Sequence, residues 1–337
     1  MDLKRGVNLG GFLSQCCHEK EHYDTFILEP DIDNIKSMGF DHVRLPIDYM
    51  VIETEDGQTK EEGYVYIRNV VDWAKKNGLN VILDLHKAYG YDFNFANTAD
   101  NSLFKNEALM DRYVKLWTVI ASHFANDDNV AFELLNEIVE EDVIEDWNDL
   151  IDRVVGEIRA IAKDTPIIYG GVMWNAATKL KFLRKPKYDN IIFTFHFYEP
   201  IIFTHQKAHW VEKMDLEKDV FYPKDMTYYN EVSSTIPQGA TVVNCKALTM
   251  GPEFMEELMT EAVEAAAKNG VGLYCGEFGV IDQAPIEDTL RWFEDANTVF
   301  KKLDIGFCVW TYKKMDFGII DEHYAPIIDK LTEIWNG

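Results

Sequence analysis

Short apolar runs of strand length alternate with amphipathic stretches along nearly the whole chain. The apolar runs predict eight strands, at residues 6–10, 41–47, 80–86, 130–137, 166–171, 190–198, 272–279 and 306–312. Between them, apolar side chains recur at helical spacing, as Ile67, Val70, Val71 and Ala74 do, which indicates helices with one buried face. Eight strand and helix pairs are typical of a (β/α)8 TIM barrel, here an α/β fold in one domain over residues 1–337.

The alternation stops between residues 199 and 251, after the sixth strand. This segment is rich in aromatic and polar residues and is too long for an ordinary connection. Segments of this length are usually functional or contain small elements of their own. We interpret residues 199–251 as a lid subdomain inserted within the single barrel domain.

Charge limits the class of partner. The chain has 33 Lys and Arg against 58 Asp and Glu, a net charge of -25. This charge opposes binding to nucleic acid and to anionic membranes, whereas a neutral substrate is compatible with it. The longest apolar runs are strand-sized, so we expect no membrane span, and we expect a monomer.

Cysteine usage bears on the compartment. The five cysteines, an odd number, show no CxxC pairing, and Cys275 and Cys308 lie within apolar strands, where reduced buried thiols are expected. The first residues lack the hydrophobic segment of a secretion signal. We therefore expect a cytoplasmic protein, or a secreted one whose signal peptide has been removed.

Two of the predicted apolar strands each have a glutamate at the C-terminal end. Glu277 lies between Gly276 and Gly279 after one apolar run, and Glu137 ends another. An ionised carboxylate beside a buried strand loses hydration unless neighbours compensate it, and strand formation does not require it. We therefore favour catalytic carboxylates, with glutamates that face solvent in the following loop as the alternative.

Other polar and aromatic residues also fall at strand ends. The set comprises Arg44, His86, Asn136, His196, Tyr198 and Trp310. In a parallel barrel these ends meet at one face, where catalytic groups gather. A single histidine at a strand end can be purely structural, but two carboxylates flanked by this set fit cleavage of a glycosidic bond.

The ordered motifs resemble a known family. They are residues 6–11 (GVNLGG), 43–46 (VRLP), 83–86 (LDLH), 134–137 (LLNE), 196–198 (HFY) and 276–279 (GEFG). This series resembles glycoside hydrolase family 5, the cellulase family, over nearly the whole chain. Residues 203–210 and 309–316 are most similar to the clostridial endoglucanase C type of that family.

The resemblance implies a retaining β-glucan hydrolase without a cofactor. It implies that Glu137 is the general acid/base and Glu277 the nucleophile, acting on β-1,4 or mixed-linkage β-1,3/1,4 glucan. Retention requires the two carboxyl groups to lie roughly 5–5.5 Å apart. Strands four and seven can place them across the barrel mouth at that separation.

The resemblance also implies roles for the neighbours. Arg44 would help to keep Glu277 charged, directly or through another residue, and Tyr198 would steady it. Asn136 would bind the sugar 2-hydroxyl, and Trp310 would form the floor of the subsite. His86 and His196 would bind hydroxyls or orient the carboxylates. Trp174 and Trp210 are candidate stacking platforms further along the cleft, with ordinary packing as the alternative.

Some positions depart from the family pattern. Lys87 follows His86 where a second His is common, Phe12 replaces a common Trp, and Thr311 replaces an Asn. We expect these changes to touch the sugar subsites and to leave the preferred glycan open. Alternation from Glu137 places Glu133 one layer deeper, as an interior partner for Arg44. We interpret Glu140 and Glu141 as part of a solvated helix start.

Several other activities compete with this prediction. The family alternatives are mannanase, xylanase, xyloglucanase and exo-β-glucanase. A non-catalytic carbohydrate-binding barrel would be expected to lack one of the two carboxylates. His205 and His209 have the spacing of a metal pair on a helix, but no Glu follows His205 as in a zinc protease, and we expect no metal site.

Overall fold

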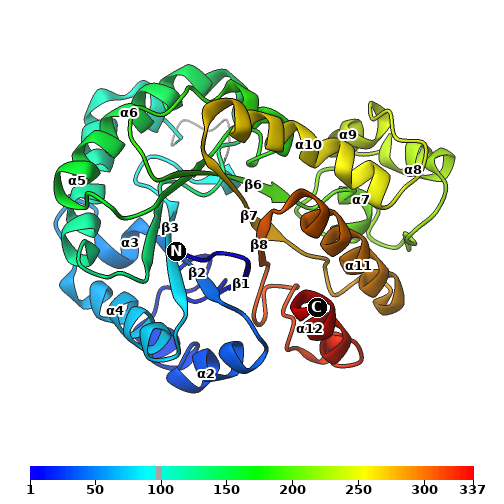
Figure 1. Cartoon of the computed structure of the whole chain (residues 1–337), viewed down its shortest axis with the longest axis horizontal. Coiled ribbons are helices and arrows are strands. Elements are labelled where there is room, and N and C mark those ends of the chain that lie inside the picture. Colours follow the sequence, from blue (N-terminus) through cyan, green and yellow to red (C-terminus); the bar gives the residue numbers. More distant parts are fainter. Residues whose placement is uncertain (96–100) are drawn as a thin grey trace.

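The computed structural model describes residues 1–95 and 101–337, over which eight parallel strands close into a barrel surrounded by helices (Figure 1). The strands pair in sequence order, and β1 pairs with β8. Their bounds are β1 Arg5–Asn8, β2 His42–Asp48, β3 Asn80–Lys87, β4 Val130–Glu133, β5 Ile167–Gly170, β6 Ile191–Phe197, β7 Gly272–Phe278 and β8 Gly306–Val309. The predicted (β/α)8 fold is confirmed.

The helices cover the outside of the barrel. Those of the barrel are α1 Lys20–Thr25, α2 Glu29–Ser37, α3 Tyr49–Ile52, α4 Glu61–Lys76, α5 Glu107–Phe124, α6 Ile144–Ile161, α10 Pro252–Asn269, α11 Ile286–Leu303 and α12 Ile328–Asn336. Short 3-10 turns are η1 Phe93–Phe95, η2 Leu103–Lys105, η3 Glu141–Val143, η4 Ala177–Phe182 and η6 Glu322–Tyr324. Among the described residues, no helix combines the length and apolarity that a bilayer crossing requires.

Strands β4 and β8 end three or more residues earlier than predicted, and one predicted helix is a 3-10 helix. Strand β4 ends at Glu133 instead of residue 137, and β8 ends at Val309 instead of residue 312. Beyond these points the backbone leaves the regular ladder, as where Tyr312 N donates to Asn8 O of the neighbouring strand β1. The short helix after β5 is η4, which packs closely against α10.

The barrel interior is layered by the two-residue period of its strands. An apolar layer contains Ile82, Ala131, Ile168, Tyr274 and Cys308, all nearly inaccessible to solvent. Two residues further along their strands, Asp84 and Glu133 form part of a polar layer. The layered core ends where polar side chains begin, at the C-terminal end of the barrel.

A bulge in β7 turns Glu277 into the barrel. On the neighbouring strand, Phe195 pairs with Cys275, but the next residue, His196, pairs with Glu277, which leaves Gly276 as an extra residue. Without the bulge, alternation from the interior Tyr274 would turn Glu277 outward. Gly276 suits this position because a Cβ there would lie 2.8 Å from Thr194 Oγ1.

The segment 199–251 contains small helices of its own. They are α7 Ile201–Thr204, α8 Met226–Ser233, η5 Pro237–Gly239 and α9 Ala240–Val243. Tyr222 and Tyr229 are buried within it, and Tyr222 binds Asp288 and Asp295 of α11. Figure 1 shows the segment extending outward beside α10 and α11. Its action as a lid stays a prediction.

The cysteines are free thiols. Cys275 and Cys308 are fully buried in β7 and β8, as their apolar surroundings in the sequence predict. Cys16, Cys17 and Cys245 are more accessible and are also unpaired.

Candidate active site

Glu277 is held by two hydrogen-bond donors at the end of β7. Arg44 Nη1 donates to its Oε1 at 2.7 Å, and Tyr198 Oη donates to its Oε2 at 2.8 Å. Donors to both oxygens suit a carboxylate anion and fix the plane of the carboxyl group. Glu277 is 5% exposed and is therefore almost entirely shielded from solvent.

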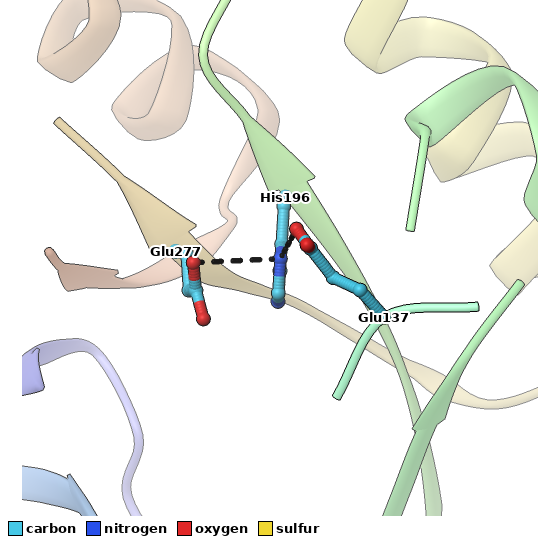
Figure 2. Close-up of side chains that lie close together, drawn as sticks. All are labelled: Glu137, His196 and Glu277. Atoms are coloured by element: carbon cyan, nitrogen blue, oxygen red, sulfur yellow. Dashed lines mark hydrogen bonds and ion pairs between the residues drawn. The ribbon is translucent and has the colours of Figure 1, made fainter. Parts of the chain in front are cut away.

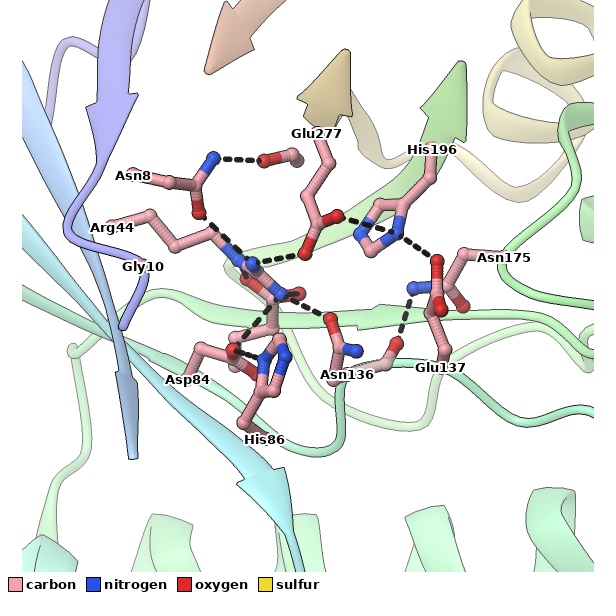
Figure 3. Close-up of polar contacts among 12 residues, drawn as sticks. Asn8, Gly10, Arg44, Asp84, His86, Asn136, Glu137, Asn175, His196 and Glu277 are labelled. Carbon is pink, nitrogen blue, oxygen red and sulfur yellow. Dashed lines mark hydrogen bonds and ion pairs between the residues drawn. The ribbon is translucent and has the colours of Figure 1, made fainter. Parts of the chain in front are cut away.

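Arg44 is a fully buried cation among carboxylates (Figure 3). Its Nε and Nη2 donate to the two oxygens of Glu133 at 2.8 and 2.9 Å, and Nη2 lies 3.0 Å from Asp84 Oδ2. Burial opposes the charge, but the carboxylates Asp84, Glu133 and Glu277 raise the pKa of Arg44 above its ordinary value. The predicted pairing of Arg44 with Glu133 is confirmed, and the geometry makes Arg44 a positioning residue for Glu277.

Two asparagines complete the shell around Arg44. Asn8 accepts from Arg44 Nη1 at 3.0 Å and donates to the carbonyls of Gly276 and Val309. Asn136 accepts from Arg44 Nη2 at 2.8 Å through Oδ1. The guanidinium therefore orients the Asn136 amide as well as the Glu277 carboxylate.

Glu137 lies just beyond the end of β4. Burial raises the pKa of its carboxyl group to about 7, against the smaller opposing effects of His86 and Arg44. Its Oε1 lies 2.7 Å from His196 Nδ1. A carboxyl group with this pKa can be protonated at neutral pH, which a general acid requires.

His196 lies between the two glutamates (Figure 2). Its Nδ1 is 2.7 Å from Glu137 Oε1 and 3.6 Å from Glu277 Oε2. Burial lowers the pKa of His196 to about 4, so the ring is neutral at pH 7. Neutral His196 can donate only one N–H, and its contact with Glu137 places that hydrogen on Nδ1.

The two carboxylates face the same space. One oxygen of Glu137, one of Glu277 and a ring nitrogen of His196 all lie within 4.8 Å of one another. This separation matches the short carboxyl spacing of retaining glycosidases and is shorter than the roughly 6.5–9.5 Å of inverting ones.

The same three residues have a donor set that could hold a metal ion. However, Glu277 already accepts from Arg44 and Tyr198, and the adjacent guanidinium repels a cation. His205 and His209 do not form the helical pair considered above, because α7 ends at Thr204. His205 packs against Tyr198 and Phe317, whereas His209 is exposed.

The loop after β5 supports the part of the site around Asn136 and His196. Asn175 is buried, its Nδ2 donates to the Asn136 carbonyl, and its carbonyl accepts from His196 N. Met173, Trp174 and Asn175 all have positive φ angles, of 53–57°. This tight turn leaves Trp174 40% exposed.

His86 has neighbours at both ring nitrogens. Nδ1 lies 2.6 Å from Asp84 Oδ2, and Nε2 lies 3.1 Å from Gln15 Nε2. Burial lowers the pKa of His86 to about 4, so Asp84 receives the N–H and Nε2 accepts from Gln15. Trp310, which is 7% exposed, stacks on His86 with 7° between the rings and 5.9 Å between the centroids.

A family model for the cellulases, glycosyl hydrolase family 5, matches residues 5–316. The chain belongs to glycosyl hydrolase family 5. It is therefore a glycoside hydrolase.

Several known proteins are similar to this family 5 hydrolase over most of its length. Endoglucanase C of Acetivibrio thermocellus is 40% identical over 99% of this chain and 98% of its own. Cellodextrinase A of Ruminococcus flavefaciens is 40% identical over 90% of this chain and 83% of its own. Thermotoga maritima Cel5A, solved with cellobiose and with mannotriose, is 26% identical, with a TM-score of 0.75 and coverage of 99% of this chain and 97% of that chain.

The structure of the family 5 hydrolase brings most predicted residues together. The residues joined by direct contacts are Arg44, Asn136, Glu137, His196, Tyr198 and Glu277. His86 and Trp310 join them through Asp84, which contacts both His86 and Arg44. Trp174 and Trp210 are exposed and outside this network.

Sequence reasoning gave no role to Asn8, Gln15, Asp84 or Asn175. Asp84 could have been found, because it is a carboxylate inside an apolar strand two residues before His86 and hence on the same face. Asn8 lies within the first quoted motif. Gln15 and Asn175 lie in loops and carry no comparable signal.

Two departures from the family pattern, Phe12 and Thr311, are buried in the structure. Phe12 is 1% exposed and stacks on Phe26, and Thr311 is buried with its hydroxyl donating to Asn8 O. Both pack inside the protein because the first loop and the segment after β8 meet there. Lys87 instead pairs with Asp92 at 2.8 Å.

The acidic run after Glu137 is only partly a solvated helix start. Glu141 is exposed and opens η3, as predicted. Glu140 is half-buried and accepts a hydrogen bond from Tyr91 Oη at 3.0 Å.

The exposed tryptophans give a testable expectation. In this family 5 hydrolase, Trp174→Ala and Trp210→Ala should each raise KM for long oligosaccharides by about 5- to 30-fold, since a stacking contact contributes about 1–2 kcal/mol. Turnover of a short aryl β-cellobioside should change little. Phe221→Ala, at an exposed position in the same segment as Trp210, serves as the control. Unchanged KM on all chain lengths would identify both tryptophans as ordinary surface residues.

Proposed function

We propose that this family 5 hydrolase is a retaining endo-β-glucanase that cleaves β-1,4 or mixed-linkage β-1,3/1,4 glucans by double displacement. The observation that supports this proposal is that an oxygen of Glu137 and an oxygen of Glu277 lie within 4.8 Å of one another, with a ring nitrogen of His196 beside them. That spacing leaves room for one anomeric carbon and its leaving oxygen, but not for an inserted water on the opposite face.

In the first step, a Glu277 oxygen attacks the anomeric carbon. The bond to the leaving oxygen breaks, and the proton of Glu137 passes to that oxygen. The products are a glycosyl ester of Glu277, an alcohol and ionised Glu137. Arg44 and Tyr198 hold the nucleophile in place before attack.

In the second step, Glu137 acts as the base. It removes a proton from water as the water oxygen attacks the anomeric carbon, and the ester bond to Glu277 breaks. Glu277 leaves as a carboxylate and Glu137 is protonated again. Two inversions at one carbon retain its configuration.

The neighbouring side chains bind the sugar in this proposal. Because Asn136 Oδ1 accepts from Arg44, its Nδ2 is the donor that a 2-hydroxyl would meet. That contact strengthens as the ring approaches the oxocarbenium-like state. Trp310, supported by His86, supplies an apolar face beneath the sugar.

The relatives support a glucan substrate. Two of them are named as an endoglucanase and a cellodextrinase, and the Cel5A structure holds cellobiose. Mannan is the second candidate, because the same Cel5A was also solved with mannotriose.

A substrate panel tests this assignment. Reducing ends released from barley β-glucan, carboxymethylcellulose, glucomannan and xylan would be measured with and without a strong chelator. We expect activity on barley β-glucan and on the cellulose derivative, undiminished by the chelator. Activity only on mannan or xylan would overturn the substrate, loss with chelator would overturn the metal-free mechanism, and inactivity on every glycan would favour a binding protein.

We also propose that the enzyme acts as a monomer, because one chain supplies every group of the catalytic network. Size-exclusion chromatography with light scattering should give a mass near 39.0 kDa. A stable dimer would contradict this. The five free thiols favour a reducing compartment.

A further inference from the structure

Gln15 reaches the catalytic network from the loop between β1 and α1. Its Nε2 lies 3.1 Å from His86 Nε2, the ring nitrogen that faces away from Asp84. The Gln15 side chain is partly exposed, whereas His86 is 2% exposed. Gln15 therefore contacts His86 from a position that solvent reaches.

The contact with His86 fixes the orientation of the Gln15 amide. His86 gives its one N–H to Asp84, so its Nε2 can only accept, and Gln15 must turn its NH2 group towards the ring. The Gln15 carbonyl oxygen then points away from His86. Within the described part of the chain, this oxygen has no hydrogen-bond partner.

The backbone of Gln15 is held in a conformation that is unfavourable for its residue type. Its φ is 53°, in the left-handed region where residues other than Gly are strained. Asp48, fully buried at the end of β2, maintains it by accepting from Gln15 N at 3.1 Å and from Ser14 Oγ at 2.7 Å. Strain of this kind persists where surrounding contacts over-determine it, often at functional sites.

A charged histidine adds a third contact to Asp48. His18 Nε2 lies 3.0 Å from Asp48 Oδ2, and its Nδ1 lies 2.8 Å from Tyr23 Oη. Burial opposes its protonation, but the hydrogen bonds to Asp48 and Cys16 raise the pKa of His18 to about 9. The loop is thus fixed on both sides of Gln15, which places its amide before substrate arrives.

We propose that Gln15 is a specificity-determining residue that binds one hydroxyl of a glucosyl unit next to the cleaved bond. The hydroxyl donates to the Gln15 carbonyl oxygen, and His86 and Asp84 hold the amide from behind. His86 then acts as a positioning residue at this point, because its own Nε2 is occupied. The inference rests on the proposed glucanase function.

The test compares how strongly kcat/KM depends on each substrate hydroxyl in the wild-type enzyme and in Gln15→Gly. The substrates are 2,4-dinitrophenyl β-cellobioside and its analogues that each lack one hydroxyl. For one analogue, the wild-type kcat/KM should be lower than for the parent by about 10-fold or more. In Gln15→Gly that penalty should shrink to less than about 2-fold, while kcat/KM on the parent falls.

The melting temperature distinguishes a role of Gln15 in substrate binding from a purely structural role. Gln15→Gly should keep or raise the melting temperature, because Gly adopts a φ of 53° without strain. Gln15→Met removes the amide at similar size and should lose the same discrimination. Gln58→Gly is the matched control, since Gln58 is exposed and bonds Thr54 through its main chain.

The outcomes are distinct. Loss of discrimination at one hydroxyl in both Gln15 variants, with Gln58→Gly unchanged, supports the proposal. Wild-type discrimination at every hydroxyl in Gln15→Gly or Gln15→Met overturns it. A wild-type enzyme inactive on the parent cellobioside would instead overturn the proposed function.

Discussion

Glu277→Gln is expected to lower turnover on β-glucan by a factor on the order of 10⁴ or more, equivalent to about 5.4 kcal/mol of transition-state stabilisation. The amide is a poor nucleophile, so the glycosyl ester cannot form at a useful rate. The fold should survive, because Arg44 keeps Glu133 and Asp84 as ionic partners. Steady-state kinetics and circular dichroism would measure the two effects.

The control for this variant is Glu287→Gln, an exposed glutamate in the first turn of α11. It should behave as the wild type. Near-normal turnover in Glu277→Gln would remove that residue from the chemistry. Inactivity accompanied by unfolding would show that its ion pair with Arg44 is required for stability.

Glu137→Ala should show a loss that depends on the leaving group. General acid catalysis typically contributes about 10²- to 10⁴-fold, and we expect a loss in that range on β-glucan. A dinitrophenol leaving group needs little protonation, so the first step on dinitrophenyl β-cellobioside should be much less affected. Azide should then speed the second step and give the β-glycosyl azide, because it attacks without a base.

The pH profile follows from the raised pKa of Glu137. The general acid must be protonated, so wild-type kcat/KM on β-glucan should fall as pH rises through about 7. In Glu137→Ala this fall should disappear. Glu141→Gln, at an exposed position that pairs with Lys179, is the matched control and should keep the wild-type profile. An alkaline limb that persists in Glu137→Ala would assign the titration to another group.

The layered barrel could be predicted from the sequence because it depends on local periodicity. The two-residue alternation predicted for residues 130–137 placed Glu133 one layer below Glu137, as a partner for Arg44. In the structure, Arg44 donates hydrogen bonds to both carboxylate oxygens of Glu133. The convergence of strand ends at one face follows from parallel pairing alone. These features require no knowledge of loop conformation.

The position of Glu277 depends on a feature that alternation does not reveal. Tyr274 lies inside the barrel, and strict alternation would direct Glu277 outward. The extra residue Gly276 corrects this, and it becomes visible in the pairing of β6 with β7, with a matching irregularity between β7 and β8. A glycine next to a glutamate in the sequence is compatible with a bulge but does not require one.

Contacts of loops with residues distant in the sequence could also not be predicted from the sequence. Asn175 donates to the carbonyl of Asn136, 39 positions away in the sequence, and Gln15 contacts His86, 71 positions away. Both depend on left-handed backbone conformations at residues other than Gly, which local propensity disfavours. Tertiary hydrogen bonds maintain these conformations, so only the folded chain shows them.

In the proposed mechanism, Glu277 forms a covalent bond to the sugar and Glu137 transfers the proton. Incubation with 2,4-dinitrophenyl 2-deoxy-2-fluoro-β-cellobioside, followed by intact-protein and peptide mass spectrometry, tests it most directly. We expect one fluorocellobiosyl group per chain, on the peptide that contains Glu277, and none in Glu277→Gln. Dinitrophenol release without a covalent adduct, or an adduct on another residue, would contradict it.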